Sequence, residues 1–243
     1  MKGPKLKGPW SIFLTRNKDR TRPDSHALAN MTISRKQALE IHFAPPNRTA
    51  THEFLSAFQK GLEDCRAATY RDRLTGQSLP NHEHDSWVGA LGYLCLLEQI
   101  GTCFQKKGHS LPASTPENSL VRALLTFSTL RDKEISAIYA LRCAFAHDFS
   151  LFNVHPKPEL THYFRLFGEI ESSIVQLPKV QWNGDFATRS TECMTSIGLT
   201  MLGDEVERIC AQLRTLAAAN QLEIVLRGGP DELVNRYGLM KML

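Results

Sequence analysis

The sequence has no apolar run long enough to span a bilayer, and its N-terminus lacks the apolar core of a signal peptide. We therefore expect a cytoplasmic protein that makes no contact with a membrane. Its 243 residues are 42% hydrophobic and 22% charged, which is the composition of an ordinary globular protein with a real core. The six cysteines form no C-x-x-C pair, and we expect reduced, mostly buried thiols.

The motifs of several large enzyme classes are also absent. The sequence has no Walker loop, dinucleotide-binding glycine fingerprint, G-x-S-x-G or kinase motif. Two histidines and two carboxylates do lie together at His82, Glu83, His84 and Asp85, but no distant Cys/His pair has zinc spacing. We favour a polar loop whose Asp85 caps the next helix, and predict no metal and no cofactor. A metal-dependent hydrolase built on this loop is the weaker alternative.

Positive charge is concentrated at the start of the chain, which the total of +4 conceals. Residues 1–36 hold nine lysines and arginines against two aspartates, a net charge of +7, so the remainder is near −3. Such an arm can track a phosphate backbone or can be a mobile terminus. We favour the mobile terminus and predict a basic flexible arm over residues 1–30, followed by a single domain over residues 31–243.

The hydrophobic pattern of that domain is mainly helical. Apolar residues recur every three or four positions over residues 51–68, 87–104, 117–129, 134–149 and 190–219. Thr51 is the expected N-cap of the first of these helices. Gly89 and Gly92 weaken the second helix unless a neighbouring helix approaches closely, which we predict. The seam over residues 190–219 favours an intramolecular bundle contact over a dimeric coiled coil.

Three stretches predict extended structure instead. Residues 31–43 have a mixed pattern typical of a short strand. Residues 162–167, 174–177 and 180–182, with the turn signal Asn183-Gly184, predict a small β-hairpin or ribbon at about 160–184. A helix continuing through residues 164–175 is the alternative. Near the C-terminus, residues 222–226 predict a short extended piece, and residues 231–240 a capped terminal helix.

The helix predicted over residues 134–149 carries one chemical anomaly. Asp132 is its expected N-cap, and Arg142 falls on an otherwise apolar stripe, where the guanidinium must find an anion. His147 follows five residues later, about 140° around a straight helix and about 7.5 Å along it. The two side chains therefore cannot meet on one phosphate, unless the helix opens or two chains share a site. The plainer interpretation is a structural ion pair and a histidine near a helix C-terminus.

The run Leu141-Arg-Cys-Ala-Phe-Ala-His147, an arginine followed by four residues and a histidine on a hydrophobic helix, resembles the signature of the HEPN superfamily. The resemblance covers roughly residues 83–152. It implies a small, mainly α-helical, usually dimeric bundle, and many such domains are metal-independent endoribonucleases in toxin–antitoxin, abortive-infection and CRISPR-associated systems. The family's catalytic pair falls on Arg142 and His147. Where the family commonly has a polar residue such as Asn, this chain has Cys143, and we count Cys143 and Asp148 as supporting residues.

The resemblance implies an endoribonuclease in which the RNA 2′-hydroxyl attacks the adjacent phosphorus. His147 would be the general acid/base and Arg142 would hold the phosphate, in a site shared by a homodimer. Single-stranded RNA is the expected substrate, and an antitoxin or regulatory protein is a further expected partner. The alternative is a HEPN-like module without nuclease activity that serves in dimerisation or ligand binding. In that case Arg142 and His147 would hold the dimer interface.

Overall fold

The computed structural model describes residues 33–44, 47–48, 52–80, 86–109, 111, 118–168 and 173–242. The predicted basic arm over residues 1–30 and the cluster from His82 to Asp85 lie outside these residues. No helix of the described ranges has both the length and the apolar character needed to cross a membrane. Seven α-helices and small sheets make up the described chain, which confirms the prediction of a mainly helical fold with a smaller β part.

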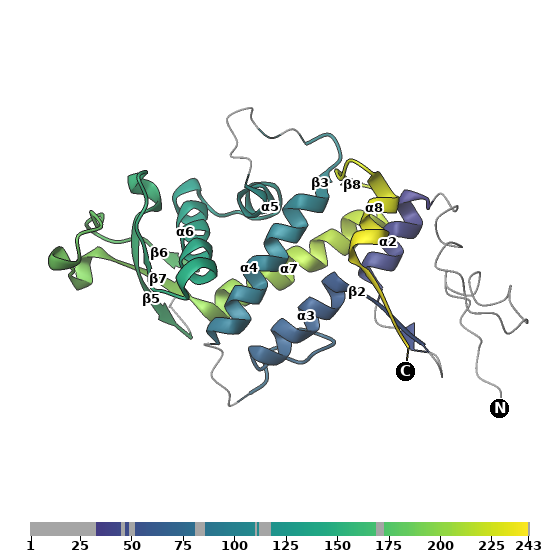
Figure 1. Cartoon of the computed structure of the whole chain (residues 1–243), viewed down its shortest axis with the longest axis horizontal. Coiled ribbons are helices and arrows are strands. Elements are labelled where there is room, and N and C mark those ends of the chain that lie inside the picture. The colour runs from purple at the N-terminus through teal and green to yellow at the C-terminus, as the bar shows by residue number, and fades with distance from the viewer. Residues whose placement is uncertain are drawn as a thin grey trace, which may run out of the picture.

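The helix α4 (Trp87–Cys103) lies at the centre of the bundle (Figure 1). It contacts α3 (Ala57–Ala68), α5 (Ser119–Phe127), α6 (Asp132–Asp148) and α7 (Leu199–Ala218). Buried apolar side chains of all five helices belong to one core cluster. Because α4 is apolar around most of its circumference, several neighbouring helices can bury it at once.

Three glycines allow the helices around α4 to approach closely. A Cβ atom on Gly89 would lie 2.4 Å from Thr69 Cγ2, and one on Gly92 would lie 2.5 Å from Cys65 Sγ. A Cβ atom on Gly101 would lie only 1.8 Å from the carbonyl oxygen of Ser119, at the start of α5. The predicted close approach at Gly89 and Gly92 is therefore confirmed, with the end of α3 as the neighbour.

Two predictions for the first part of the domain are wrong. Residues 35–43 form the helix α2 (Arg35–Phe43) and not a strand, because Ser34 and Gln37 make a capping box that starts a helix. The next helix does not begin at Thr51. Instead β2 (His52–Ser56) comes first, and α3 begins after Ser56, whose side chain accepts a hydrogen bond from the Gln59 N–H at 2.9 Å.

The first and last elements meet at one end of the molecule. The strand β2 pairs antiparallel with β1 (Asn47–Arg48) and with β9 (Gly238–Met242), near the end of the chain. Next to them, α2 contacts α8 (Gly229–Tyr237), which is the terminal helix predicted over residues 231–240, except that residues 238–242 form β9 (Figure 1). The extended piece predicted after α7 is β8 (Leu222–Ile224), which pairs with β3 (Phe104–Lys106).

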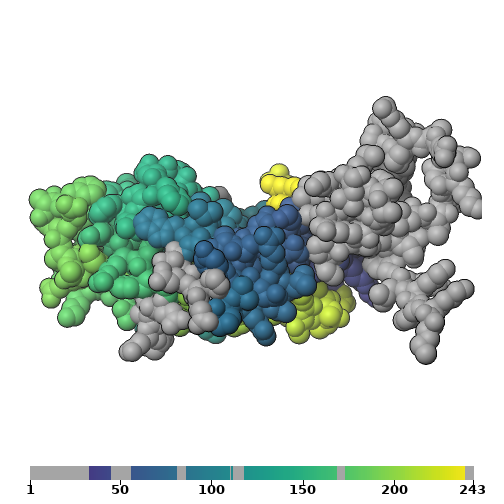
Figure 2. Space-filling view, turned by 90° about the horizontal axis from the view of Figure 1, so that it is seen from below, coloured from purple at the N-terminus to yellow at the C-terminus, as the bar shows by residue number. Residues whose placement is uncertain are grey.

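A four-stranded sheet forms the opposite end of the elongated molecule, seen in green in Figure 2. Its strands lie in the order β4 (Phe152–Asn153), β5 (His162–Phe167), β7 (Met194–Gly198), β6 (Val175–Gln176). The pair β5–β7 is parallel, and the other two pairs are antiparallel. The alternative of a helix over residues 164–175 is wrong.

The predicted β-hairpin is also wrong in its pairing. Residues 180–182 form no strand, and after Gly184, which has a φ of +89°, the chain continues through the 3-10 turns Phe186–Thr188 and Thr191–Cys193. The partner of β5 comes from the stretch predicted as helix over residues 190–219. Consequently α7 begins only at Leu199, and Thr195 of the predicted seam lies in β7. The seam residues from Leu199 to Leu213 are buried within the bundle, as predicted.

Candidate functional site

The helix α6 presents the motif residues on the surface of the bundle. It begins after Arg131, one residue earlier than predicted, and the Glu134 side chain accepts a hydrogen bond from the Arg131 backbone N–H at 2.8 Å. Ile135, Ile138, Leu141 and Phe145 are among its buried residues, and they leave an outward face for the polar side chains. The helix ends at Phe149, which adopts a left-handed conformation with a φ of 49°.

Arg142 finds its anion within the chain, on α4. Its Nη2 donates to Glu98 Oε2 at 3.0 Å, and its Nε lies 2.8 Å from Oε1, close enough for an ion pair but too bent for a second hydrogen bond. Each side chain is 25% exposed. Partial burial opposes the charge on Arg142, but the Glu98 carboxylate outweighs it and raises the pKa of Arg142 above its ordinary value.

Beside the C-terminal half of α6 lies an open hollow of about 580 Å³, where the helix meets β4 and the turn at Phe186. The α6 residues Tyr139, Cys143 and His147 line it, because a spacing of four residues places them on one face of the helix. Asp148 lies beside them in the lining. The structure therefore brings together His147, Cys143 and Asp148 and leaves Arg142 outside the hollow.

His147 and Asp148 occupy the last turn of α6 and are exposed. The C-terminus of a helix carries a partial negative charge, so a hydrogen-bond donor or a cation is favoured at this position. Among the described residues none makes a hydrogen bond or ion pair with the His147 side chain, which is exposed and lines the hollow. His147 can therefore exchange a proton with a bound molecule.

Cys143 is tied to its neighbour on the same helix face. Burial raises the pKa of Tyr139, and a side-chain hydrogen bond with Cys143 raises it further. Tyr139 is thus a neutral phenol at physiological pH, and its partner is the thiol at the position where the resemblance leads one to expect a polar residue. The Cys143–Tyr139 pair forms part of the helical wall of the hollow.

The other wall comes from segments that the sequence did not connect with α6. It includes Phe152, Val154 and His155 from β4 and the residues after it, together with Phe186. Val154 is 61% exposed and Phe186 is 50% exposed, so apolar surface lines the rim of the hollow. No sequence signal identifies His155 as a site residue, because the reversal of the chain at Phe149 is what carries it back toward α6.

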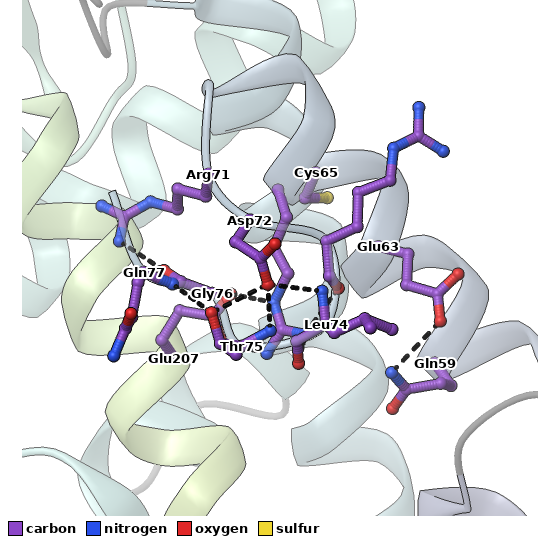
Figure 3. A network of polar contacts seen from close by, with 12 residues as sticks. Gln59, Glu63, Cys65, Arg71, Asp72, Leu74, Thr75, Gly76, Gln77 and Glu207 are labelled. Atoms are coloured by element: carbon purple, nitrogen blue, oxygen red, sulfur yellow. Dashed lines mark hydrogen bonds and ion pairs between the residues drawn. The ribbon is translucent and has the colours of Figure 1, made fainter. Parts of the chain in front are cut away.

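A second polar network, around residues 59–77, has a structural explanation (Figure 3). Arg66 donates from Nε and Nη2 to the two oxygens of Glu207 at 2.8 and 2.6 Å, and Arg71 pairs with Asp204 at 2.6 Å. Asp72 accepts hydrogen bonds from the N–H groups of Leu74 and Thr75 and from the Thr75 hydroxyl, as Figure 3 shows. These contacts join the turn after α3 to α7, and the charges compensate one another.

Within the ranges that the structure describes, no three His, Cys, Asp or Glu side chains form a group that could hold a metal ion. No family model, no curated protein and no solved structure matches this chain. The HEPN resemblance therefore rests on the residues from Leu141 to His147 alone.

Proposed function

We propose that this protein is a metal-independent endoribonuclease that cleaves single-stranded RNA in the cytoplasm, as a dimer, in a toxin or defence system. The observation that carries the proposal is the exposure of His147, the histidine of the HEPN-like motif, on the wall of the hollow. A hollow of about 580 Å³ lies within the usual range of about 300–1,000 Å³ for small-molecule sites, so it can take a nucleotide unit.

The chemistry needs only a proton acceptor and a bound phosphate. His147 removes the proton of the 2′-hydroxyl, whose oxygen attacks the adjacent phosphorus and displaces the 5′-oxygen. The products are a 2′,3′-cyclic phosphate and a 5′-hydroxyl. General acid–base catalysis of this kind typically contributes about 10²–10⁴ in rate. Single strands suit the reaction, because a flexible backbone can align the attacking and leaving oxygens.

The separation of Arg142 and His147 supports the proposal of a dimer. Since Arg142 points to Glu98 and lies outside the hollow of its own chain, a phosphate near His147 can meet an Arg142 only from a second copy. The outward face of α4 and α6 suits such a copy. It exposes 67% of Val88 and 47% of Phe149, and it carries both members of the Glu98–Arg142 pair. A face with both charges can pair with itself about a two-fold axis.

The test is cleavage of end-labelled single-stranded RNA in EDTA, with analysis of the new ends. Wild-type protein should give cyclic-phosphate ends, and His147→Ala should give none while its dimer and its thermal stability stay unchanged. His109→Ala is the matched control, because His109 is also exposed but does not line the hollow. Equal loss of cleavage in both variants, or of cleavage and dimer together in His147→Ala, contradicts the proposed role of His147.

The second candidate is a helical module for dimerisation or ligand binding without nuclease activity. The ion pair between Arg142 and Glu98 favours it, since an arginine whose charge is already compensated has less to offer a phosphate. In this case wild-type protein cleaves no RNA in EDTA, and Arg142→Ala weakens the dimer. The RNA-cleavage assay on wild-type protein and a light-scattering measurement of the mass of Arg142→Ala therefore distinguish the two functions.

A further inference from the structure

His155 is held at the rim of the hollow by three hydrogen bonds. Its ring Nδ1 accepts from the backbone N–H of Lys157 at 3.0 Å. The backbone N–H of His155 donates to Thr161 Oγ1 at 3.0 Å, and the Thr161 hydroxyl donates to the backbone carbonyl oxygen of His155 at 2.8 Å. Because Thr161 is buried, the backbone of this exposed histidine has a fixed position, and the bond from Lys157 orients its ring.

The bond to Lys157 also decides where the proton of His155 lies. A ring nitrogen that accepts from an amide N–H carries no hydrogen of its own, so in the neutral ring the hydrogen is on Nε2. Nε2 can then donate a hydrogen bond. His155 thus differs from His147: the bond from Lys157 leaves its Nε2–H as the group free to donate, whereas no described residue bonds to either ring nitrogen of His147.

The charges around the hollow show why a neutral donor matters there. Neither lysine nor arginine is among the residues that line it, and Arg142 is engaged by Glu98 outside it. Asp148 adds a carboxylate to the lining. Apart from the Arg142 that a second copy would supply, a phosphate in the hollow must be held by neutral hydrogen-bond donors of this chain, and His155 is a lining residue whose Nδ1 is already engaged, which leaves Nε2 to donate.

We infer that His155 is a substrate-binding residue of this site, whose Nε2–H donates to a nonbridging oxygen of the scissile phosphate. The inference rests on the proposed RNA cleavage. In that step the 2′-oxygen bonds to phosphorus, the bond from phosphorus to the 5′-oxygen breaks, His147 takes the 2′-hydroxyl proton, and water protonates the leaving oxygen. His155 exchanges no proton and stabilises the charge that builds up on the nonbridging oxygens.

The test compares wild-type protein with His155→Ala and His155→Gln, on single-stranded RNA in EDTA. The glutamine amide places an N–H group close to the position of Nε2, so His155→Gln should cleave within a few-fold of wild type. His155→Ala should lose about 10²-fold in rate, the usual effect of removing one such donor. His109→Ala again controls for an exposed histidine outside the hollow, and thermal unfolding reports on folding.

A second substrate distinguishes direct contact of His155 with the phosphate from a purely structural role of His155. Replacing one nonbridging oxygen of the scissile phosphate by sulfur, a poor acceptor, should slow wild type and His155→Gln for one of the two diastereomers. The same replacement should leave His155→Ala unaffected. If His155→Ala cleaves as fast as wild type, or keeps the same sulfur effect, the inference is overturned while the proposed nuclease stands. If wild type cleaves neither substrate, the proposed function fails, and the inference fails with it.

Discussion

Glu98 on α4 and Arg142 on α6 form an ion pair across the bundle, and each is the single charged residue in an apolar stretch of its helix. A quarter-exposed pair of this kind is partly removed from water, so each charge depends on the other. The pair also orients α6, and with it the face that carries His147. The motif arginine therefore has a structural role in the single chain.

A double-mutant cycle of Glu98→Gln and Arg142→Met should measure this coupling. We expect an interaction free energy of about 1–2 kcal/mol, between the values for exposed and for fully buried pairs. The measurement is the free energy of unfolding from urea titrations of the four proteins. Lys36 and Glu40 on α2 are the control pair, because they lie 3.9 Å apart with Lys36 almost fully exposed. Their coupling should be near zero, and an equally small value for Glu98 and Arg142 would show that the pair does not hold the helices.

Because His42 is buried, the protein should become less stable to unfolding in acid. It is 2% exposed, its ring packs against Phe58 and Phe104, and no described residue forms a hydrogen bond with its Nε2. Burial lowers the pKa of His42 from 6.5 to about 3, so the folded protein keeps the ring neutral. The unfolded chain binds the proton below pH 6.5, and stability is lost as the pH falls from there toward 3, at about 1.4 kcal/mol per pH unit.

The comparison that isolates this effect is wild type against His42→Leu at pH 7 and pH 5. Carboxylates titrate in both proteins and change both stabilities alike. The quantity to measure is therefore the difference between the two proteins in how much the free energy of unfolding changes with pH. The free energy of unfolding of wild type should fall by about 2 kcal/mol more than that of His42→Leu. His109→Ala, which removes an exposed histidine, should keep the wild-type dependence. Parallel curves for wild type and His42→Leu would contradict a neutral buried ring.

The long helices with an uninterrupted apolar period were predictable, and the errors fell on the short helix α2 and on strands that are specified by distant partners. The helices α4, α5 and α6 lie close to their predicted ranges, because each has an uninterrupted apolar period and caps close to its ends. The strand β2 was missed because its partner β9 lies near the other end of the chain. Likewise β7 continues directly into α7, and only its parallel pairing with β5 separates the two.

Some residues of the candidate site could likewise be predicted from the sequence, and others could not. Helix geometry alone showed that Arg142 and His147 face different directions, and the lone charge of Glu98 in an apolar helix was a sequence signal for the partner of Arg142. His155 carried no such signal, because its place beside α6 depends on the reversal at Phe149 and on the pairing of β4 with β5. His147, Cys143 and Asp148, which the sequence singled out, lie on one wall of the hollow, and tertiary structure supplies the other wall.

Gly101 should be the glycine least tolerant of substitution in α4. Alanine is intrinsically better than glycine in a helix by about 1 kcal/mol, but here its Cβ would lie 1.8 Å from the Ser119 carbonyl oxygen. Since that oxygen is backbone, α5 must move, and we expect Gly101→Ala to cost about 1–3 kcal/mol or more in the free energy of unfolding. Gly61→Ala on α3 is the control, because its Cβ meets only the end of the Leu96 side chain at 3.3 Å. A stabilised Gly101→Ala protein would contradict the close approach of α4 and α5.

Val88 tests the face proposed for the dimer. It lies near the start of α4, is 67% exposed, and follows Trp87, whose ring centroid lies 5.8 Å from that of Phe149. If a second copy covers this face, Val88→Asp places a carboxylate in a desolvated interface, and the dimer should dissociate at micromolar concentration. Light scattering should then give the mass of one chain, 27.4 kDa, for the variant and twice that for wild type.

The matched control is Leu74→Asp, which adds the same charge at a side chain that is 74% exposed in the turn after α3. It should stay dimeric, because that turn is held by hydrogen bonds from Arg66 of α3 and is not part of the face proposed for the dimer. Cleavage should follow the oligomeric state, since Arg142 of one copy and His147 of the other must come together. A monomeric Val88→Asp protein that still cleaves RNA at the wild-type rate would show that each chain works alone. Catalysis would then depend on the residues of a single hollow, with Arg142 left to its structural pairing with Glu98.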